Sequence, residues 1–233
     1  MKTIGLLGGT AWPSTIEYYR YLNQIAQRYY GGRHSASLLL KSIDYAPIAY
    51  CYGHDWALAR QRFMPELQAL YDLAPDCIVV CCNTLHRAID ELADTLPSAP
   101  PLIHIVTETA RMARQHGHRR VLLLGTQFTM ENGYYAERLS RSGLEVVTPE
   151  RADRKRIQSI QSAVADGLAT PQANEYFHTL LQRYADCDSA VLACTELPAV
   201  IDAASSPIPT LDPMRIQCDA AFEFAVAEPS ADG

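Results

Sequence analysis

Two short stretches of this chain repeat each other, and this repeat constrains the fold more than any other feature. Each stretch is an apolar run that leads into a cysteine; the two are residues 78–84 and 190–196. The cysteines, Cys82 and Cys194, stand 112 positions apart. A second pair of similar stretches, residues 4–10 and 121–126, has its threonines 116 positions apart. Two nearly equal spacings between paired motifs predict two similar halves, each with one thiol.

Short apolar segments alternate with helical segments along most of the chain. We expect strands at residues 3–7, 37–43, 77–81, 102–105, 120–124, 144–148 and 189–193. Among the expected helices are 84–96, 130–142 and one that opens at Ser14 with the capping-box spacing to Glu17. Such alternation predicts right-handed βαβ units and parallel sheets, hence an α/β fold.

The chain is long enough for two small α/β lobes. Proline-rich stretches at 97–101 and 205–209 are the natural crossings between lobes. The sequence therefore predicts a first lobe of residues 1–99 plus 208–233, and a second lobe of residues 100–207.

Composition excludes several classes of function. The net charge of −6 disfavours binding to nucleic acid or to anionic membranes. No apolar run approaches the roughly 20 residues of a membrane span, and no signal peptide is recognisable at the N-terminus. Seven cysteines, an odd number, are typical of reduced thiols, so we expect a cytoplasmic protein.

The candidate functional residues all follow predicted strands. In parallel sheets, ligands bind beyond the carboxyl ends of the strands. The candidates there are Thr10, Cys82, Asn83, Thr84, Thr126, Cys194, Thr195 and Glu196. Each also precedes a helix, whose free N–H groups hold carboxylates and lower the pKa of thiols. If the halves face each other, one thiol can remove a proton from a carbon centre while the other adds one to the opposite face.

Four motifs together resemble the aspartate/glutamate racemase family. They are residues 1–10, Cys82-Asn83-Thr84-Leu85-His86, residues 124–130 and Cys194-Thr195-Glu196. The resemblance implies two Rossmann-like lobes related by a pseudo-twofold axis, with the active site between them. It also implies a homodimer that racemises an amino acid resembling aspartate or glutamate, without a cofactor, by proton transfer between two cysteines.

Residue by residue, the resemblance assigns Cys82 and Cys194 as the acid/base pair. Thr10, Asn83, Thr84 and Thr195 match substrate-holding positions. Further candidate substrate contacts are Tyr52, Thr126 and Thr129, which offer hydroxyl groups. Glu196 reads equally as a proton partner for Cys194 or as a charge at a helix N-terminus.

The sequence departs from the family where some members carry cations for a second substrate carboxylate. The loop Asp44-Tyr45-Ala46-Pro47-Ile48-Ala49-Tyr50-Cys51-Tyr52 contains no Arg or Lys. Ala165 occupies the place of a lysine found in some members. A free carboxylate favours an Arg or Lys partner, so the sequence predicts a substrate with an uncharged or smaller side chain, or an acidic one held by N–H groups and hydroxyls.

Alternative interpretations remain at this point. The chain could be a non-catalytic two-lobed binding protein, or a related two-cysteine isomerase or racemase acting on another small carboxylate. Cys82 and His86 together could suggest zinc, but two local ligands are too few, so we expect no metal and assign His86 to capping or orienting the site. Gly8-Gly9-Thr10 lacks the remaining features of a nucleotide loop, and we expect no cofactor.

Overall fold

The computed structural model describes residues 1–52, 54–168 and 170–228, and divides the chain into two compact units. The first unit comprises Met1–His104 together with the segment from Gln217 onward. The second unit is Ile105–Ile216. The boundaries expected from the proline-rich stretches, after residues 99 and 207, precede these divisions by five and nine residues.

A three-stranded parallel sheet forms the centre of the first unit. Its strands are β1 (Ile4–Gly8), β2 (Leu38–Ser42) and β3 (Cys77–Val80), in the order β2-β1-β3. The strand expected at 102–105 is reduced to one parallel bridge between Leu102 and Ile78, because helix α5 begins at Ile105.

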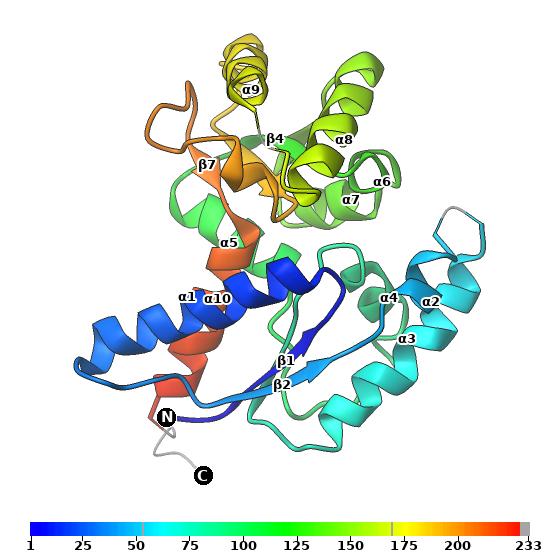
Figure 1. Cartoon of the computed structure of the whole chain (residues 1–233), viewed down its shortest axis with the longest axis vertical. Coiled ribbons are helices and arrows are strands. Elements are labelled where there is room, and N and C mark those ends of the chain that lie inside the picture. The colour runs from blue at the N-terminus through cyan, green and yellow to red at the C-terminus, as the bar shows by residue number, and fades with distance from the viewer. Residues whose placement is uncertain (53, 169, 229–233) are drawn as a thin grey trace. The chain divides into compact units, whose positions relative to one another are not determined.

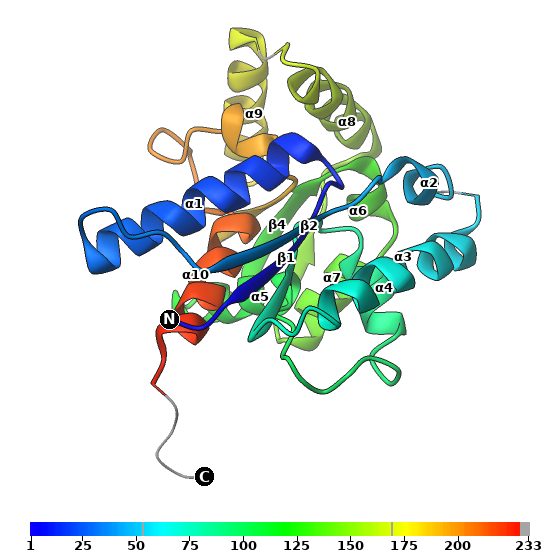
Figure 2. The ribbon, with the colours of Figure 1, turned by 60° about the horizontal axis from the view of Figure 1, so that its bottom comes forward.

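Helices cover both faces of this sheet (Figures 1 and 2). On one face lie α1 (Trp12–Tyr30) and the last helix, α10 (Pro213–Val226). On the other face lie α2 (Ala46–Ala49), α3 (Trp56–Tyr71) and α4 (His86–Glu91). Since side chains alternate along a strand, Ile78 and Val80 pack with the α3 side while their neighbours point to the opposite face.

The second unit has a four-stranded parallel sheet of order β5-β4-β6-β7. The strands are β4 (Arg120–Gly125), β5 (Glu145–Val147), β6 (Ser189–Ala193) and β7 (Thr210–Leu211). Helices α8 (Arg151–Ala165) and α9 (Pro171–Arg183) pack against Leu122 and Leu124 on one face. Helices α5 (Ile105–Gln115) and α7 (Tyr134–Arg141) pack against Val121 and Leu123 on the other. The predicted α/β class with two parallel-sheet lobes is confirmed.

The repeat in the sequence is also a repeat in topology. Leu7 pairs with Val80 in the first sheet, and Leu124 pairs with Leu192, 112 positions after Val80, in the second. Beyond these central pairs, Leu102 stands beside β3 as β7 stands beside β6. The two units therefore place their cysteines at the same position relative to the central strand.

Three helices differ from the sequence prediction. The helix expected over 84–96 is only α4, because a turn carries the chain as far as Leu85. The helix expected over 130–142 is split into α6 (Gln127–Glu131) and α7 by Gly133, whose φ of 87° is outside the helical region. Helix α1 begins at Trp12 instead of Ser14, with Pro13 in its first turn, where a missing N–H costs nothing.

Among the described residues, no helix combines the length and the apolar character that crossing a bilayer requires.

Candidate active site

In each unit the candidate residues gather at the carboxyl edge of the sheet. Thr10 follows β1 and Cys82 follows β3 in the first unit. Thr126 follows β4 and Cys194 follows β6 in the second. Because β1 pairs with β3 and β4 pairs with β6, each loop with a threonine lies beside the loop with a cysteine. We call the two sets the Cys82 half-site and the Cys194 half-site.

The same backbone turn presents both cysteines. The N–H of Cys82 donates to the carbonyl of Val80 over 2.8 Å, and the N–H of Cys194 donates to Leu192 over 2.8 Å. In both units the turn follows a buried strand and places the cysteine at the carboxyl edge of the sheet, where Cys194 is buried. In the first unit Cys81 is buried while Cys82 is partly accessible. Of these two neighbours, Cys82 is therefore the one that a ligand can reach.

Hydrogen-bond donors surround the sulfur of Cys82. Burial raises the pKa of the Cys82 thiol, whereas the N–H groups of Leu85 and Thr84 and the hydroxyls of Tyr45 and Thr10 oppose that rise. All four groups favour the thiolate, although each hydroxyl has only one proton to give. In this structure the Thr10 hydroxyl donates its proton to the carbonyl of Cys81 over 2.9 Å, which ties the two loops of the half-site together.

Tyr45 is a site residue that the sequence did not single out. Its hydroxyl donates to the hydroxyl of Tyr52, and its ring lies 5.9 Å from the Tyr52 ring, edge to face. Burial, and next the proximity of Cys82, raises the pKa of Tyr45, so this phenol remains protonated. The tyrosine content of the loop was visible in the sequence, but nothing there showed that two tyrosines share one hydrogen bond beside Cys82.

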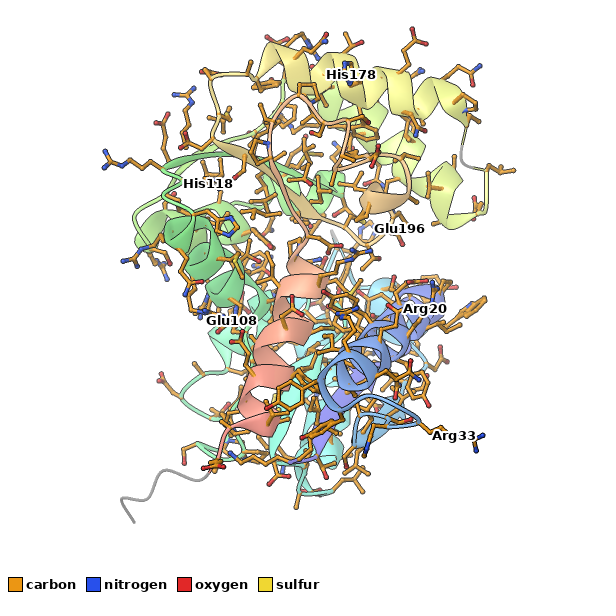
Figure 3. The ribbon with its side chains drawn as sticks, turned by 90° about the vertical axis from the view of Figure 1, so that its left-hand side faces the viewer. Arg20, Arg33, Glu108, His118, His178 and Glu196 are labelled. Atoms are coloured by element: carbon orange, nitrogen blue, oxygen red, sulfur yellow. The ribbon has the colours of Figure 1, made fainter. Side chains whose placement is uncertain are left out.

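A carboxylate accompanies the sulfur of Cys194. The thiol donates to Glu196 Oε2 over 2.7 Å, and the Thr195 hydroxyl donates to the same oxygen over 3.2 Å. Figure 3 shows Glu196 apart from His118 and His178, two histidines of the same unit. The contact pairs Cys194 with an acceptor, whereas Cys82 is paired with donors.

The two remaining threonine candidates of the second unit belong to a helix cap. Thr126 is the N-cap of α6, where its hydroxyl accepts from the N–H of Thr129 over 3.1 Å. The two hydroxyls are 3.0 Å apart. Thr129 is buried and its side chain packs against Gly125, while Thr126 is partly exposed. Thr126 is thus the member of this pair that a ligand reaches more readily.

Cations near the Cys82 half-site are engaged with other groups. Arg60 and Arg87 both bind Glu91, with N–O distances of 3.3 and 2.9 Å. The Trp56 indole donates to the same carboxylate over 2.9 Å. Arg62 donates to the carbonyl of Pro47. A second carboxylate of a substrate therefore competes with ligands that these arginines already have.

No set of three or more His, Cys, Asp or Glu side chains within the described ranges is placed to bind a metal ion. His86, the nearest histidine to Cys82 in sequence, directs its Nδ1 to the carbonyl of Cys82, 2.8 Å away.

Residues 7–221 match the profile of the Asp/Glu/Hydantoin racemase family. The chain belongs to this family. Its similarity to the broad specificity amino-acid racemase RacX of Bacillus subtilis is 24% identity over 212 residues, covering 90% of this chain and 92% of RacX. The predicted enzyme class, a racemase, is therefore confirmed at the level of the family.

Solved structures of other Asp/Glu racemase-like proteins share the whole fold with this family member. A Yersinia pestis protein assigned as an Asp/Glu racemase is 32% identical, with a TM-score of 0.88 over 97% of this chain and 100% of that one. An aspartate racemase homologue from Pyrococcus horikoshii OT3 is 26% identical, with a TM-score of 0.86 over 97% of this chain and 100% of that one. Both matches span the two units.

Proposed function

We propose that this protein is a cofactor-independent amino-acid racemase that inverts the α-carbon by proton transfer between Cys82 and Cys194. The observation that carries the proposal is the pair of matching turns, each of which places one cysteine at the carboxyl edge of its sheet. A binding protein has no need of two thiols at matching positions. Two-base inversion requires them, because one proton leaves one face of the α-carbon while another arrives at the opposite face.

The surroundings of the two sulfurs suggest how the proton is shared at rest. Donors around Cys82 favour its thiolate, whereas the Cys194 thiol donates its proton to Glu196. Because burial keeps the pKa of Cys82 raised, its thiol holds a proton most of the time, so we assign the role of base to the minor thiolate form of Cys82 and the role of acid to the Cys194–Glu196 pair. A buried thiolate whose pKa is raised is also a stronger base toward the weakly acidic α-proton.

The proposed proton transfer requires that one substrate molecule contacts both sulfurs. Thr10, Asn83 and Thr84 from the first unit, and Thr126 and Thr195 from the second, are the groups that we assign to the substrate carboxylate. Their hydroxyl, amide and backbone donors can stabilise the negative charge that develops when the α-proton leaves. Tyr52, with its partner Tyr45, would line the side of the substrate beside Cys82.

A panel of L- and D-amino acids in D2O tests the proposal directly. Racemisation in D2O replaces the α-proton with deuterium, so the α-proton signal of a substrate disappears from its NMR spectrum as its enantiomer accumulates. We expect this for at least one amino acid. Binding of an amino acid with neither exchange nor inversion would instead identify a binding protein.

We also propose a compartment and an oligomeric state for the protein. All seven cysteines are free thiols, which suits a reducing cytoplasm, and we propose a cytoplasmic homodimer. Trp12, Ile16 and Tyr19, spaced along one face of α1, are exposed to 69%, 47% and 52% and offer an apolar stripe for association.

Glu196→Gln is expected to lower kcat by about tenfold, since a charged acceptor next to an acid/base group contributes about 1.5–3 kcal/mol at most. The variant keeps the shape of the side chain but removes the charge that holds the Cys194 proton. Glu145→Gln, which removes a carboxylate bound to Arg120 in the same unit, serves as the control. An unchanged kcat in Glu196→Gln would leave Glu196 without a role in proton transfer.

Removal of metals and trapping of carbonyl cofactors are expected to leave the activity unchanged. The proposed chemistry uses two thiols and the hydrogen-bond donors around them, so it needs neither a Lewis acid nor a Schiff base. The measurement is racemisation before and after dialysis against a chelator, and with and without hydroxylamine. Activity that is lost with the chelator and restored by a divalent ion would contradict the two-thiol scheme.

A further inference from the structure

A row of three buried polar side chains in the first unit ends at the backbone carbonyl of Cys82. It joins Tyr18 of α1, Gln217 of α10 and His86 of α4, whose exposed fractions are 1%, 0% and 0%. Tyr18 and Gln217 are 2.9 Å apart, and Gln217 and His86 are 3.4 Å apart. Burying polar groups costs free energy unless they are hydrogen-bonded, and the proposed proton transfer uses none of these three residues.

The carbonyl of Ile103 fixes the orientation of Gln217. Gln217 Nε2 lies 2.7 Å from this carbonyl oxygen, which can only accept a hydrogen bond. The amide nitrogen must therefore be on that side, and the amide oxygen faces the hydroxyl of Tyr18. The second N–H of the amide points to His86 Nε2.

The two ends of the imidazole then assign its proton. The carbonyl of Cys82 can only accept, so His86 Nδ1, 2.8 Å away, carries a hydrogen. Gln217 Nε2 can only donate, so His86 Nε2 accepts. Together the two contacts assign the neutral Nδ1–H form of the ring, since the first requires a hydrogen on Nδ1 and the second excludes one on Nε2.

In the second unit the carbonyl of Cys194 has a different hydrogen-bond partner from the carbonyl of Cys82. There the carbonyl of Cys194 accepts from the backbone N–H of Leu197 over 3.2 Å. Leu85 occupies the position 112 residues before Leu197, and its N–H lowers the pKa of Cys82, as a donor facing the sulfur would. Pro198 stands where His86 stands in the first unit. His86 thus supplies to the Cys82 carbonyl the hydrogen bond that a backbone N–H supplies in the other turn.

We propose that His86, held by Gln217 as the neutral Nδ1–H tautomer, is a positioning residue that binds the Cys82 carbonyl and leaves the Leu85 N–H to the Cys82 sulfur. The effect on racemisation rests on the proposed function. The tautomer and the state of the Cys82 thiol do not depend on it.

Two substitutions separate the two hydrogen bonds of the ring. In His86→Asn the side-chain amide nitrogen reaches the place of Nδ1 and can donate to the Cys82 carbonyl. In His86→Gln the amide reaches the place of Nε2, so the contact to Gln217 is kept and the one to Cys82 is lost. We expect His86→Gln to lower kcat about tenfold with little change in KM, and His86→Asn to retain most of the activity. Equal losses in the two folded variants, or a larger loss in His86→Asn, would overturn the inference.

Alkylation of Cys82 gives a second readout, followed by mass spectrometry of the peptide that contains it. If the Leu85 N–H turns from the sulfur to the vacated carbonyl, the thiolate loses a donor, and alkylation of Cys82 at pH 8 slows several-fold in His86→Gln. Alkylation of Cys82 that stays at the wild-type rate in this variant would contradict the proposal. The comparison is made on the substrate-free protein, so it decides the inference even if the wild-type protein racemises nothing.

The wild-type protein provides a third test that depends on no variant folding. Histidine labelled with ¹⁵N reports by NMR which ring nitrogen carries the proton. We expect His86, identified by the signals missing from His86→Asn, to show a protonated Nδ1 and an unprotonated Nε2 at pH 7. A proton on Nε2 would overturn the assignment while leaving the two-thiol scheme unaffected.

Discussion

Cys82→Ala and Cys194→Ala are each expected to lower kcat for racemisation by about a thousandfold or more, because each removes one of two groups that move the proton. Both variants are expected to fold, since each cysteine lies at a sheet edge and alanine fits the same turn. In D2O we expect any remaining exchange of the α-proton to be confined to one enantiomer. That enantiomer should differ between the two variants, since each retains the thiol on the opposite face of the carbon.

The controls come from neighbouring cysteines. Cys81→Ala changes the buried residue next to Cys82, and Cys187→Ala changes a buried residue of the second unit. Both are expected to keep kcat within about threefold of the wild type, since neither thiol takes part in the reaction. If Cys82→Ala or Cys194→Ala still interconverts enantiomers at nearly the wild-type rate, proton transfer between two thiols is ruled out.

Aspartate and glutamate are expected to have kcat/KM values about ten- to a hundredfold below those of asparagine and glutamine, because one charge-assisted hydrogen bond contributes about 1.5–3 kcal/mol. The amides match the acids in size and differ in charge. Neither the loop before Tyr52 nor position 165 offers a cation, and Arg60 and Arg87 are bound to Glu91.

A preference for aspartate or glutamate above about a thousandfold, roughly 4 kcal/mol, would contradict this expectation. It would show that a cation reaches the side-chain carboxylate of the substrate. The residues to replace by glutamine would then be Arg60, Arg62, Lys155 and Arg156, the cations nearest in sequence to the two cation-free segments. Loss of the preference in one of these variants would identify the partner.

The repeated strand-and-cysteine motif predicts much of this fold because its two signals, the apolar run and the polar residues that follow it, are both local in the sequence. Apolar runs that lead into Cys82 and Cys194 are buried parallel strands, and the polar residues after them lie at the sheet edge. The helix boundaries were less predictable. Ser14 and Glu17 have the spacing of a capping box, but the helix begins at Trp12, with Pro13 in its first turn. The capping box and the proline are local signals of similar strength, so the sequence does not show which of them sets the first residue of the helix.

The neighbours of the two sulfurs were the least predictable part of the site. Tyr45 is 37 residues before Cys82, and its hydroxyl reaches the sulfur only through the packing of the loop after β2. Gln217 is 131 residues from His86 and belongs to the last helix. Glu196 was the exception, because it is two residues from Cys194 and its role as partner or as helix charge was already open from the sequence.

The path of the chain bears on the order in which the protein can fold during synthesis. The second unit is continuous, whereas the first unit is completed by the segment from Gln217 onward. The N–H of Lys2 donates to the carbonyl of Ala225, so the residues before β1 and the end of α10 meet only after residue 225 has left the ribosome. The residues around Cys194 are thus translated as one continuous segment, whereas Gln217, which holds His86 next to Cys82, is translated after them. A nascent chain therefore holds a complete second unit before it holds a complete first one.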